Sequence, residues 1–596
     1  MTADEVQRFG VWAPDAGRVE IFVAGRVLPL ARDERGWWSV EVEEAGQGTD
    51  YRLSVDGAEG RPDPRSAWQP DGVHGSSRVV DHSRFPWNDQ GWRGIELSSS
   101  VLYELHVGTF SEAGTFDAAI AHLDHLTNLG VTAVELLPVA EFSGRWGWGY
   151  DGVDLYAPHH AYGGPDGLKR LVDACHRRGL GVLLDVVFNH LGPEGNYLES
   201  FGPYLTDRHA TPWGPAVNLD DARSAGITDF FVDNAIMWLR DYHLDGLRLD
   251  AVQALIDGAT MPFLQELSHR VEELAGQLGR SMVLVAESDK NDPGLVQPRQ
   301  AGGAGLDGWW SDEFHHALHA VLTGERNGYY ADFGSLDALA KAVRQSYVND
   351  GTWSTYRRRV HGRPLPPGLS GHRFVVYLQS HDQVGNRPAG ERTGALMSAR
   401  RLKVGAALLF TAPFVPMLFQ GEEWGASTPF QYFSDHGDPV LGHLVAEGRL
   451  RDLARLDWPV ESMPDPQDPL TFEHSKLDWT EPERLPHRQL LDWHRRLIRL
   501  RREVPELGDG RLDRVRVNVE GESCLVVRRG PITTACNLGE KATLLEADGT
   551  LLLASEEDVS LGGGLLHLPP ATVGILTAGP GGRPDDTAGP GGRTPN

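Results

Sequence analysis

Four short apolar segments of this chain end in side chains that can carry acid–base chemistry. The four segments with their polar residues are DVVFNH (Asp185, Asn189, His190), DGLRLDAV (Arg248, Asp250), VLVAESD (Glu287) and LQSHDQVGN (His381, Asp382). A single acid in an apolar strand is usually one half of a structural ion pair. Burying several carboxyl groups is costly, however, so a repeated pattern of this kind indicates a reaction centre.

The residue types suit the cleavage of a glycosidic bond. The transition state resembles an oxocarbenium ion, which needs an anion at the anomeric carbon and a proton donor at the leaving oxygen. Asp250 lies two positions after Arg248, on the same face of a strand, so the guanidinium should keep that carboxylate ionised. Glu287 follows the apolar run MVLVA, which should keep it protonated. A retaining pair of this kind lies about 5–5.5 Å apart.

Histidine side chains accompany the carboxyl groups in two of the four segments. A lone histidine is more often a hydrogen-bonded core residue, but here each follows the same kind of apolar strand as the acids. We expect His190 and His381 to act as neutral hydrogen-bond donors to sugar hydroxyls.

The elements that must position these groups alternate between short strands and helices from residue 101 to about residue 500. In DGLKRLVDACHRRGL the residues Leu168, Leu171, Val172 and Cys175 share one helical face. Buried strands that alternate with helices predict a parallel sheet, and the length favours a closed (β/α)₈ barrel. All strands of such an α/β barrel open on one face, where the four segments would converge.

The regions on either side of the barrel read as β structure. We predict an N-terminal β-sandwich over 1–90, a catalytic barrel over 91–504, a C-terminal β-sandwich over 505–577 and a disordered tail over 578–596. The tail repeats AGPGGR and has few apolar residues. The N-terminal sandwich resembles a carbohydrate-binding module, and a binding role and a packing role both stay open.

The composition of the chain limits the classes of binding partner that we expect. The net charge of −27, from 83 acidic and 56 basic residues, disfavours nucleic acid and favours a neutral substrate. No stretch approaches the roughly 18 apolar residues of a membrane span, and the first residues do not resemble a signal peptide. With three cysteines, among which Cys524 and Cys536 could face each other across two strands, we expect a cytoplasmic protein without disulfides. Segment 191–235 has no calcium-loop spacing, so we expect neither a metal nor a cofactor.

Together, the four motifs resemble the α-amylase family of glycoside hydrolases, glycoside hydrolase family 13, over about residues 1–577. The resemblance implies that Asp250 is the nucleophile, that Glu287 is the general acid and base, and that Asp382 binds and distorts the sugar. It also implies that Asp185 anchors Arg248. The sugar-binding positions that it implies are Tyr150, His190, Arg248 and His381.

Finer motifs resemble the members of that family that act on glucans ending in trehalose. These motifs are YELHVGTF, GRWGWGYDGVDLYAPHHAYGGPDG, TPWGPAVNLDD, WWSDEFHHALH, HDQVGNR and LFQGEEWGAS. The resemblance implies hydrolysis of the α-1,4 bond next to the terminal trehalose of maltooligosyltrehalose, with α-1,4-glucan oligosaccharides as further partners. A branching transglycosylase and an inactive glucan-binding scaffold remain alternatives, although the intact acids Asp250, Glu287 and Asp382 disfavour the scaffold.

Discrimination of trehalose from glucose must come from the leaving side of the bond. We expect Asp312, Glu313 and His315 to hold the leaving sugar, with Trp310 as a stacking surface. A role in capping the following helix is the alternative, because acids are common in a first helical turn. Most of the 17 tryptophans should be core residues. The exceptions that we expect, in strand-end loops, are Trp146, Trp148, Trp213 and Trp310.

Overall fold

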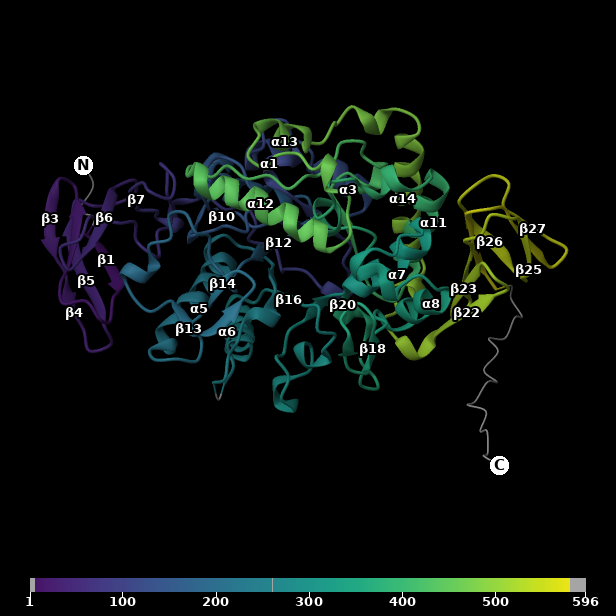
Figure 1. Cartoon of the computed structure of the whole chain (residues 1–596), viewed down its shortest axis with the longest axis horizontal. Coiled ribbons are helices and arrows are strands. Elements are labelled where there is room, and N and C mark those ends of the chain that lie inside the picture. Colours follow the sequence, from purple (N-terminus) through teal and green to yellow (C-terminus); the bar gives the residue numbers. More distant parts are fainter. Residues whose placement is uncertain (1–5, 260, 579–596) are drawn as a thin grey trace.

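A computed structural model describes residues 6–259 and 261–578 (Figure 1). Two small antiparallel sheets begin the chain, with strand orders β1-β5-β4 and β3-β2-β6-β7. Their strands are β1 Val6–Trp12, β2 Val19–Val23, β3 Arg26–Pro29, β4 Ala31–Arg32, β5 Trp37–Glu43, β6 Asp50–Val55 and β7 Ser77–Arg78. In β2 the burial alternates, with Val19, Ile21 and Val23 inside, as expected for a sheet that is covered on one face.

The centre of the molecule is a closed barrel of parallel strands in the order β12-β15-β16-β17-β20-β21-β8-β9. Its strands are β8 Leu102–Leu105, β9 Ala133–Leu136, β12 Gly181–Val186, β15 Gly246–Leu249, β16 Val283–Glu287, β17 Gly308–Trp310, β20 Phe374–Tyr377 and β21 Val415–Phe419. Nearly every residue of these strands is buried, because side chains fill the interior and helices cover the outside. The predicted fold class is confirmed.

Helices follow most of the barrel strands. The longer ones are α3 Leu123–Leu129, α4 Gly164–His176, α5 Ser224–Asp241, α6 Phe263–Leu278, α7 Asp312–Thr323, α8 Leu336–Gln345, α11 Ala399–Thr411, α12 Pro439–Arg455 and α14 His487–Glu503. The apolar face predicted for α4 is buried, with Leu168, Leu171, Val172 and Cys175 all at most 1% exposed. None of the helices in the described part of the chain is long and apolar enough to span a membrane.

The segment that precedes β8 closes the bottom of the barrel. Ile95 and Leu97 belong to the cluster of side chains that fills the barrel interior. They fit because Gly181 and Gly308 lack side chains: a Cβ at Gly181 would lie 2.2 Å from Ile95, and one at Gly308 would lie 2.7 Å from Leu97. The chain before β8 is therefore part of the barrel core.

The same segment is held from outside by a buried hydrogen-bond network. The ring of His176 in α4 lies 2.8 Å from Asp89 and 3.0 Å from Asp245, through its two nitrogens. Trp92 donates to the other oxygen of Asp245 at 2.6 Å, and His243 lies 2.8 Å from Asp89. We call Asp89, Trp92, His176, His243 and Asp245 the floor network.

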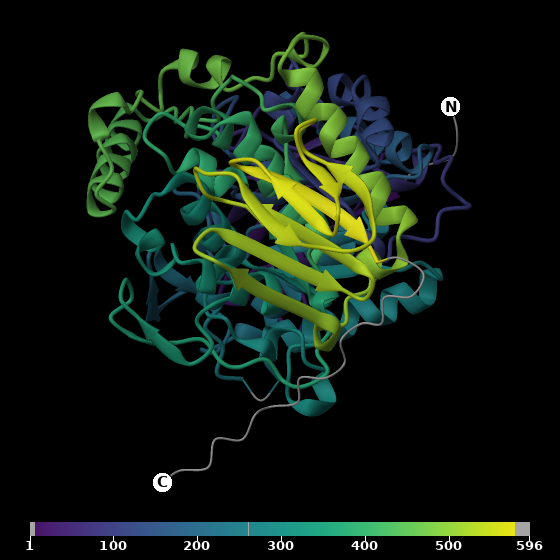
Figure 2. The ribbon, with the colours of Figure 1, turned by 90° about the vertical axis from the view of Figure 1, so that its right-hand side faces the viewer.

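Two further sheets, with strand orders β22-β23-β24-β29-β26 and β25-β28-β27, cover the opposite end of the molecule from the N-terminal sheets (Figures 1 and 2). Their strands are β22 Val515–Glu520, β23 Cys524–Arg529, β24 Ile532–Asn537, β25 Thr543–Glu546, β26 Thr550–Ala554, β27 Ser560–Gly562, β28 Leu565–Leu568 and β29 Thr572–Thr577. Arg529 ties them to the barrel by donating to the carbonyl groups of Thr411 and Ala412 at 3.0 and 3.1 Å.

The two cysteines of this region do not face each other, contrary to the possibility raised by the sequence. Cys524 is opposite Asn537 and Cys536 is opposite Leu525. Because alternate residues of a strand point to opposite faces, the two thiols lie on opposite faces of the sheet. All three cysteines are free and buried. The tail predicted from residue 578 lies, from 579 onwards, outside the described residues.

Candidate active site

Arg248 gathers the carboxyl groups of neighbouring barrel strands. It is fully buried, and its Nη1 donates to Asp185 Oδ2 at 2.8 Å and to Asp250 Oδ1 at 2.7 Å. Its Nη2 lies 3.8 Å from Glu287 Oε2. The guanidinium also lies over the ring of Trp310, with Cζ 4.4 Å from the ring centroid. One cation thus orients groups from β12, β15 and β16 at the carboxyl ends of the strands.

Asp250 is held by two donors and remains partly exposed to solvent. Asn189 Nδ2 donates to Asp250 Oδ2 at 2.7 Å, opposite the bond from Arg248. The side chain of Asp250 is 12% exposed. A carboxylate with both oxygens hydrogen-bonded, yet reachable from solvent, has the fixed orientation that a nucleophile needs.

Glu287 lies in a different electrostatic environment from Asp250. Burial raises the pKa of Glu287 well above its usual range, the cation of Arg248 opposes this, and Asp250, Asp312 and Asp382 raise it further. Its Oε2 accepts a hydrogen bond from the backbone N–H of Ala251 at 2.6 Å. The protonated form that a general acid requires is therefore favoured, as the sequence predicted.

Ala251 adopts a backbone conformation that alanine rarely takes. Its φ of 40° and ψ of 50° lie in the left-handed region, where a Cβ is unfavourable. This conformation directs the N–H of the residue after Asp250 toward Glu287. Strain of about 1–3 kcal/mol at such a position is typical of functional sites.

His381 departs from the expected neutral donor. Burial alone would lower the pKa of this ring, but the carboxylates of Asp382 and Glu104 raise it to about 9. Nδ1 lies 2.5 Å from Glu104 Oε1, and Nε2 lies 2.8 Å from the hydroxyl of Tyr150. The protonated ring is therefore favoured, by the predicted site residue Asp382 and by Glu104, an acid that was not among the predicted site residues.

Asp382 and Tyr150 both lie beside Nε2 of His381, at 3.5 and 2.8 Å. Asp382 is the second residue of the short helix α9 (His381–Gly385), and its side chain is 40% exposed. Tyr150 donates to Asp185 Oδ2 at 2.5 Å and its ring is stacked on His381. The helix starts here because Ser380 and Gln383 form a capping box, which the motif SHDQ encodes.

His190 and Trp213 form a stacked pair. Their ring centroids are 4.8 Å apart at an interplanar angle of 11°. Burial lowers the pKa of His190, which favours the neutral ring. Trp213 lies in the turn between β13 (Leu205–Thr211) and β14 (Gly214–Val217) and is 51% exposed. An exposed flat ring of this kind can stack on a pyranose.

Two of the residues expected on the leaving side are buried and bonded within the protein. Glu313 accepts hydrogen bonds from the backbone N–H groups of Val348 and Asn349 at 2.8 and 2.7 Å. His315 is 1% exposed, and its ring nitrogens contact Leu378 O at 2.6 Å and the Tyr330 hydroxyl at 2.8 Å. Both face the interior from α7, so the helical period of this segment, rather than its polarity, decides their direction.

The tryptophan predictions are also corrected in part. Trp310 is 1% exposed and packs inside the barrel beneath Arg248, so it offers no surface to a sugar. Trp148 is 7% exposed and donates to Gln431 O at 2.9 Å. The half-buried ring of Trp146 is stacked on Phe472, with centroids 5.6 Å apart. Trp213 alone of the four presents a largely exposed ring.

Among the residues expected on the leaving side, Asp312 lies near enough to Glu287 to affect its pKa. Its Oδ1 accepts hydrogen bonds from the hydroxyl of Tyr377 and, at 3.4 Å, from Gln383. Burial, together with Asp382, raises the pKa of Asp312 to about 6, although the bond from Tyr377 opposes this. Asp312 also contributes to the raised pKa of Glu287.

Sequence reasoning missed two buried acids beneath the site. Glu104 on β8 and Glu135 on β9 are paired in register, and each is 1% exposed. Burial, and secondarily Glu104, raises the pKa of Glu135 well above its usual range. The signal was present, since LYEL and AVEL each place one acid in an otherwise apolar strand.

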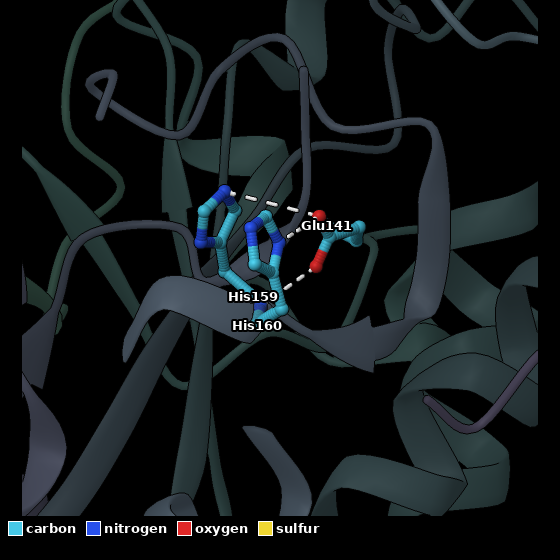
Figure 3. Close-up of side chains that lie close together, drawn as sticks. All are labelled: Glu141, His159 and His160. Carbon is cyan, nitrogen blue, oxygen red and sulfur yellow. Dashed lines mark hydrogen bonds and ion pairs between the residues drawn. The ribbon is translucent and has the colours of Figure 1, made fainter. Parts of the chain in front are cut away.

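A cluster outside this site brings together groups that could hold a metal ion, namely Glu141, His159 and His160 (Figure 3). Glu141 binds the ring Nδ1 of His160 at 2.6 Å and its backbone N–H at 2.8 Å. Nδ1 of His159 accepts from the N–H of Ala161, so the proton of this ring sits on Nε2, which faces Glu141 at 3.9 Å. A protonated nitrogen cannot be a ligand, so these bonds favour a brace for the loop that carries Tyr150.

The barrel and the carboxyl groups at its strand ends define a class of enzyme. Residues 88–209 match the family model described as alpha amylase, catalytic domain. A solved structure, a putative alpha amylase from Salmonella typhimurium, superposes with a TM-score of 0.89 at 36% identity, covering 97% of this chain and 98% of that one. The protein is an enzyme of the α-amylase family.

Proteins that are similar to this chain over nearly its whole length identify a narrower family within this class. The chain is 51% identical to a malto-oligosyltrehalose trehalohydrolase of Arthrobacter ramosus, over 94% of this chain and 98% of that protein. It is 46% identical to the protein of the same name from Mycobacterium tuberculosis H37Rv, over 96% and 99%. A 1,4-alpha-glucan branching enzyme of Corynebacterium jeikeium is 27% identical over 70% and 60%. The chain belongs to the malto-oligosyltrehalose trehalohydrolase family.

Proposed function

We propose that this protein hydrolyses the α-1,4-glucosidic bond next to the terminal trehalose of maltooligosyltrehalose, releasing trehalose and keeping the α configuration. The observation that carries the chemistry is the contrast between two carboxyl groups that share Arg248. Asp250 is held by two donors, 2.7 Å from the arginine, whereas Glu287 lies 3.8 Å from it and has a raised pKa. The names of the full-length relatives support the choice of substrate.

In the first step Asp250 attacks the anomeric carbon while Glu287 gives its proton to the leaving oxygen of trehalose. The bond between the anomeric carbon and that oxygen breaks, and a covalent glycosyl–Asp250 ester forms. In the second step the Glu287 carboxylate takes a proton from water, whose oxygen attacks the same carbon. The ester breaks, both carboxyl groups return to their starting states, and two inversions leave the α configuration.

Other residues around the cleft hold the substrate in this proposal. Asp382, with its 40% exposed side chain, would hold hydroxyls of the sugar that is cleaved. The remaining sugar contacts that we propose are Tyr150, His190 and Trp213. Arg248 and His381, which the sequence also suggested as sugar contacts, are 0% and 1% exposed and instead orient the groups around them. Asp312 is our candidate on the leaving side, where its position beside Tyr377 and Gln383 would let it accept a hydrogen bond from trehalose.

A product assay tests this function. Purified protein is incubated with maltooligosyltrehalose or with maltopentaose, and the products are separated by chromatography. We expect free trehalose from the first substrate and much slower cleavage of the second. The acids alone cannot tell the two substrates apart, so this difference would have to come from contacts on the leaving side of the bond. Equal rates on both substrates would contradict the substrate assignment.

Branching is the alternative function, because the chain is also similar to a branching enzyme. Its first half-reaction is the same, but a sugar hydroxyl instead of water accepts the glycosyl group. A branching enzyme would shift the iodine colour of amylose without releasing small sugars, whereas the proposed hydrolase would release trehalose.

We also propose a role in trehalose formation and a cytoplasmic location. The first follows from the proposed product. The second is supported by the low cysteine content, since three cysteines in 596 residues offer no disulfide framework of the kind found in small secreted proteins. Cell fractionation with an antibody against the protein would test the location.

A further inference from the structure

Glu104 grips His381 through two bonds. This carboxyl group lies on β8, is 1% exposed, and accepts the backbone N–H of His381 on Oε2 at 3.0 Å. Its other oxygen lies 2.5 Å from the ring Nδ1 of the same histidine. One buried acid therefore fixes both the first residue of α9 and the rotation of its ring.

The ring passes this constraint on through a chain of hydrogen bonds. Nε2 of His381 lies 2.8 Å from the hydroxyl of Tyr150, and that hydroxyl lies 2.5 Å from Asp185 Oδ2. Asp185 Oδ2 in turn accepts from Arg248 Nη1, which also donates to Asp250. The chain begins at Glu104 and ends at the proposed nucleophile.

The direction of this chain depends on the proton of His381. When both ring nitrogens carry a proton, Nε2 donates to the oxygen of Tyr150, and the Tyr150 hydroxyl must donate to Asp185. When the ring is neutral with its proton on Nδ1, Nε2 becomes an acceptor and competes with Asp185 for the same hydroxyl proton.

We propose that Glu104 is a positioning residue for the reaction: it holds His381 in the doubly protonated form and so directs the Tyr150 hydroxyl toward Asp185. This inference rests on the proposed function, because it assigns a role in the same cleft. Asp185 then keeps two donors and holds Arg248, which orients Asp250. Glu104 itself touches no substrate.

The other charged groups around His381 do not replace Glu104. Asp382 is the neighbouring residue, lies 3.5 Å from Nε2 and also raises the pKa of the ring, but its side chain is 40% exposed, so solvent screens its charge more than that of the buried Glu104. The further titratable groups that face the ring are Glu135 and Asp185, which are acidic, Arg248 and His106, which are basic, and Tyr150. Glu104 is the buried carboxyl that bonds directly to the ring.

The test compares Glu104→Gln with Glu135→Gln. Glutamine has nearly the shape of glutamate but carries no charge and has only one acceptor oxygen. It therefore cannot accept hydrogen bonds on two oxygens from the backbone N–H and the ring Nδ1–H of His381. Glu135 is the matched control: it is paired with Glu104 in register and equally buried, and its Oε2 has no hydrogen-bond partner among the residues described.

The first readout is the pH profile of kcat/KM. We expect the alkaline limb of Glu104→Gln to move to lower pH by about one to two units, because removing a neighbouring opposite charge lowers a histidine pKa by that order. The limb of Glu135→Gln should stay where the wild-type limb lies, because burial raises the pKa of Glu135 well above its usual range and the substitution therefore removes no charge. A purely structural role for Glu104 would lower activity equally at every pH.

The second readout needs no substrate. Because the folded pKa of His381 is raised to about 9, its contribution to stability is full below the unfolded value and is lost as pH rises through about 9. The Tm deficit of Glu104→Gln relative to the wild type should therefore be larger at pH 6 than at pH 10. For Glu135→Gln any deficit should not shrink in this way.

The outcomes separate this inference from the proposed function. The pH profiles are measured with whichever of maltooligosyltrehalose and maltopentaose the wild type cleaves, so a failure to release trehalose leaves the comparison intact. An unshifted limb for Glu104→Gln, or a Tm deficit that is the same at pH 6 and pH 10, would overturn the positioning role even in an enzyme that releases trehalose.

Discussion

Nη1 of Arg248 lies 2.7 Å from Oδ1 of Asp250, two positions further along the same strand direction. The bond is possible because alternate residues of a strand point to the same side. The other terminal nitrogen lies 3.8 Å from Glu287 on the neighbouring strand. The arginine thus lies closer to the acid that must be ionised than to the acid that must be protonated.

Replacing either acid should abolish catalysis without unfolding the protein. We expect Asp250→Asn and Glu287→Gln each to lower kcat by several orders of magnitude, because each removes one half of the covalent mechanism. Circular dichroism should show the wild-type fold in both variants. Proton NMR of the wild-type reaction should show the α-anomer first, and an initial β-anomer would contradict retention.

The two acids at the start of α7 should respond differently to substitution. Asp312→Asn should lower kcat/KM for maltooligosyltrehalose more than for maltopentaose, because a leaving-side acceptor is changed. Glu313→Gln should instead lower Tm and affect both substrates alike, since Glu313 binds the backbone of Val348 and Asn349. A specificity change in Glu313→Gln with an unchanged Tm would show that this division is wrong.

Trp213 should matter for binding and little for stability. Its ring is 51% exposed and stacked on His190, so Trp213→Ala should raise KM by about 2- to 10-fold, the equivalent of about 0.5–1.5 kcal/mol for an aromatic contact. Tm should change by no more than a degree or two. The matched variant Trp213→Phe keeps a flat ring and should recover most of the binding, whereas an equal loss in both variants would argue against stacking.

The floor network should make stability depend on pH. Burial alone would raise the pKa of Asp89, but hydrogen bonds from His176 and His243 lower it; burial alone would lower the pKa of His176, but Asp245 and Asp89 raise it. The carboxylate contributes stability that is lost as pH falls, and the imidazolium contributes stability that is lost as pH rises. The network should therefore stabilise most between about pH 4 and pH 6.5.

Asp89→Asn tests this dependence. Its Tm should fall below that of the wild type by several degrees near pH 5.5 and by less near pH 9. Asp117→Asn is the matched control, because it breaks an exposed ion pair with Arg170 in which both side chains are about half exposed. A Tm loss for Asp89→Asn that is equal at both pH values would rule out a charged network.

Much of the fold and part of the site could be predicted from local patterns. Apolar strands ending in acids predicted the barrel. The predicted acids Asp185, Asp250 and Glu287 do lie around the guanidinium of Arg248, and Tyr150 links Asp185 to the ring of His381. The direction of a side chain within a polar run could not be predicted in the same way. WWSDEFHH contains the polar residues SDE and two histidines, yet Trp310, Glu313 and His315 face the interior, because the strand and helix periods place them there.

Properties that depend on residues far apart in the sequence could not be predicted either. The proton of His381 is held by Glu104, which is 277 residues away in sequence. The same holds for Glu135, since nothing in AVEL shows that its neighbour in the barrel is another acid. The boundaries at residues 90, 504 and 577 and the sugar contacts of individual residues stay predictions.

The closed barrel floor also limits how the protein can be divided into working parts. Ile95 and Leu97 occupy space that two strand glycines leave open, and Asp89 and Trp92 are bonded to the barrel from outside. A fragment that begins at β8, where the first barrel strand begins, would expose an apolar opening and leave Asp245 without the Trp92 donor. A catalytic fragment made without the N-terminal sheets would have to start before Asp89, so the smallest autonomous unit is larger than the barrel that carries the chemistry.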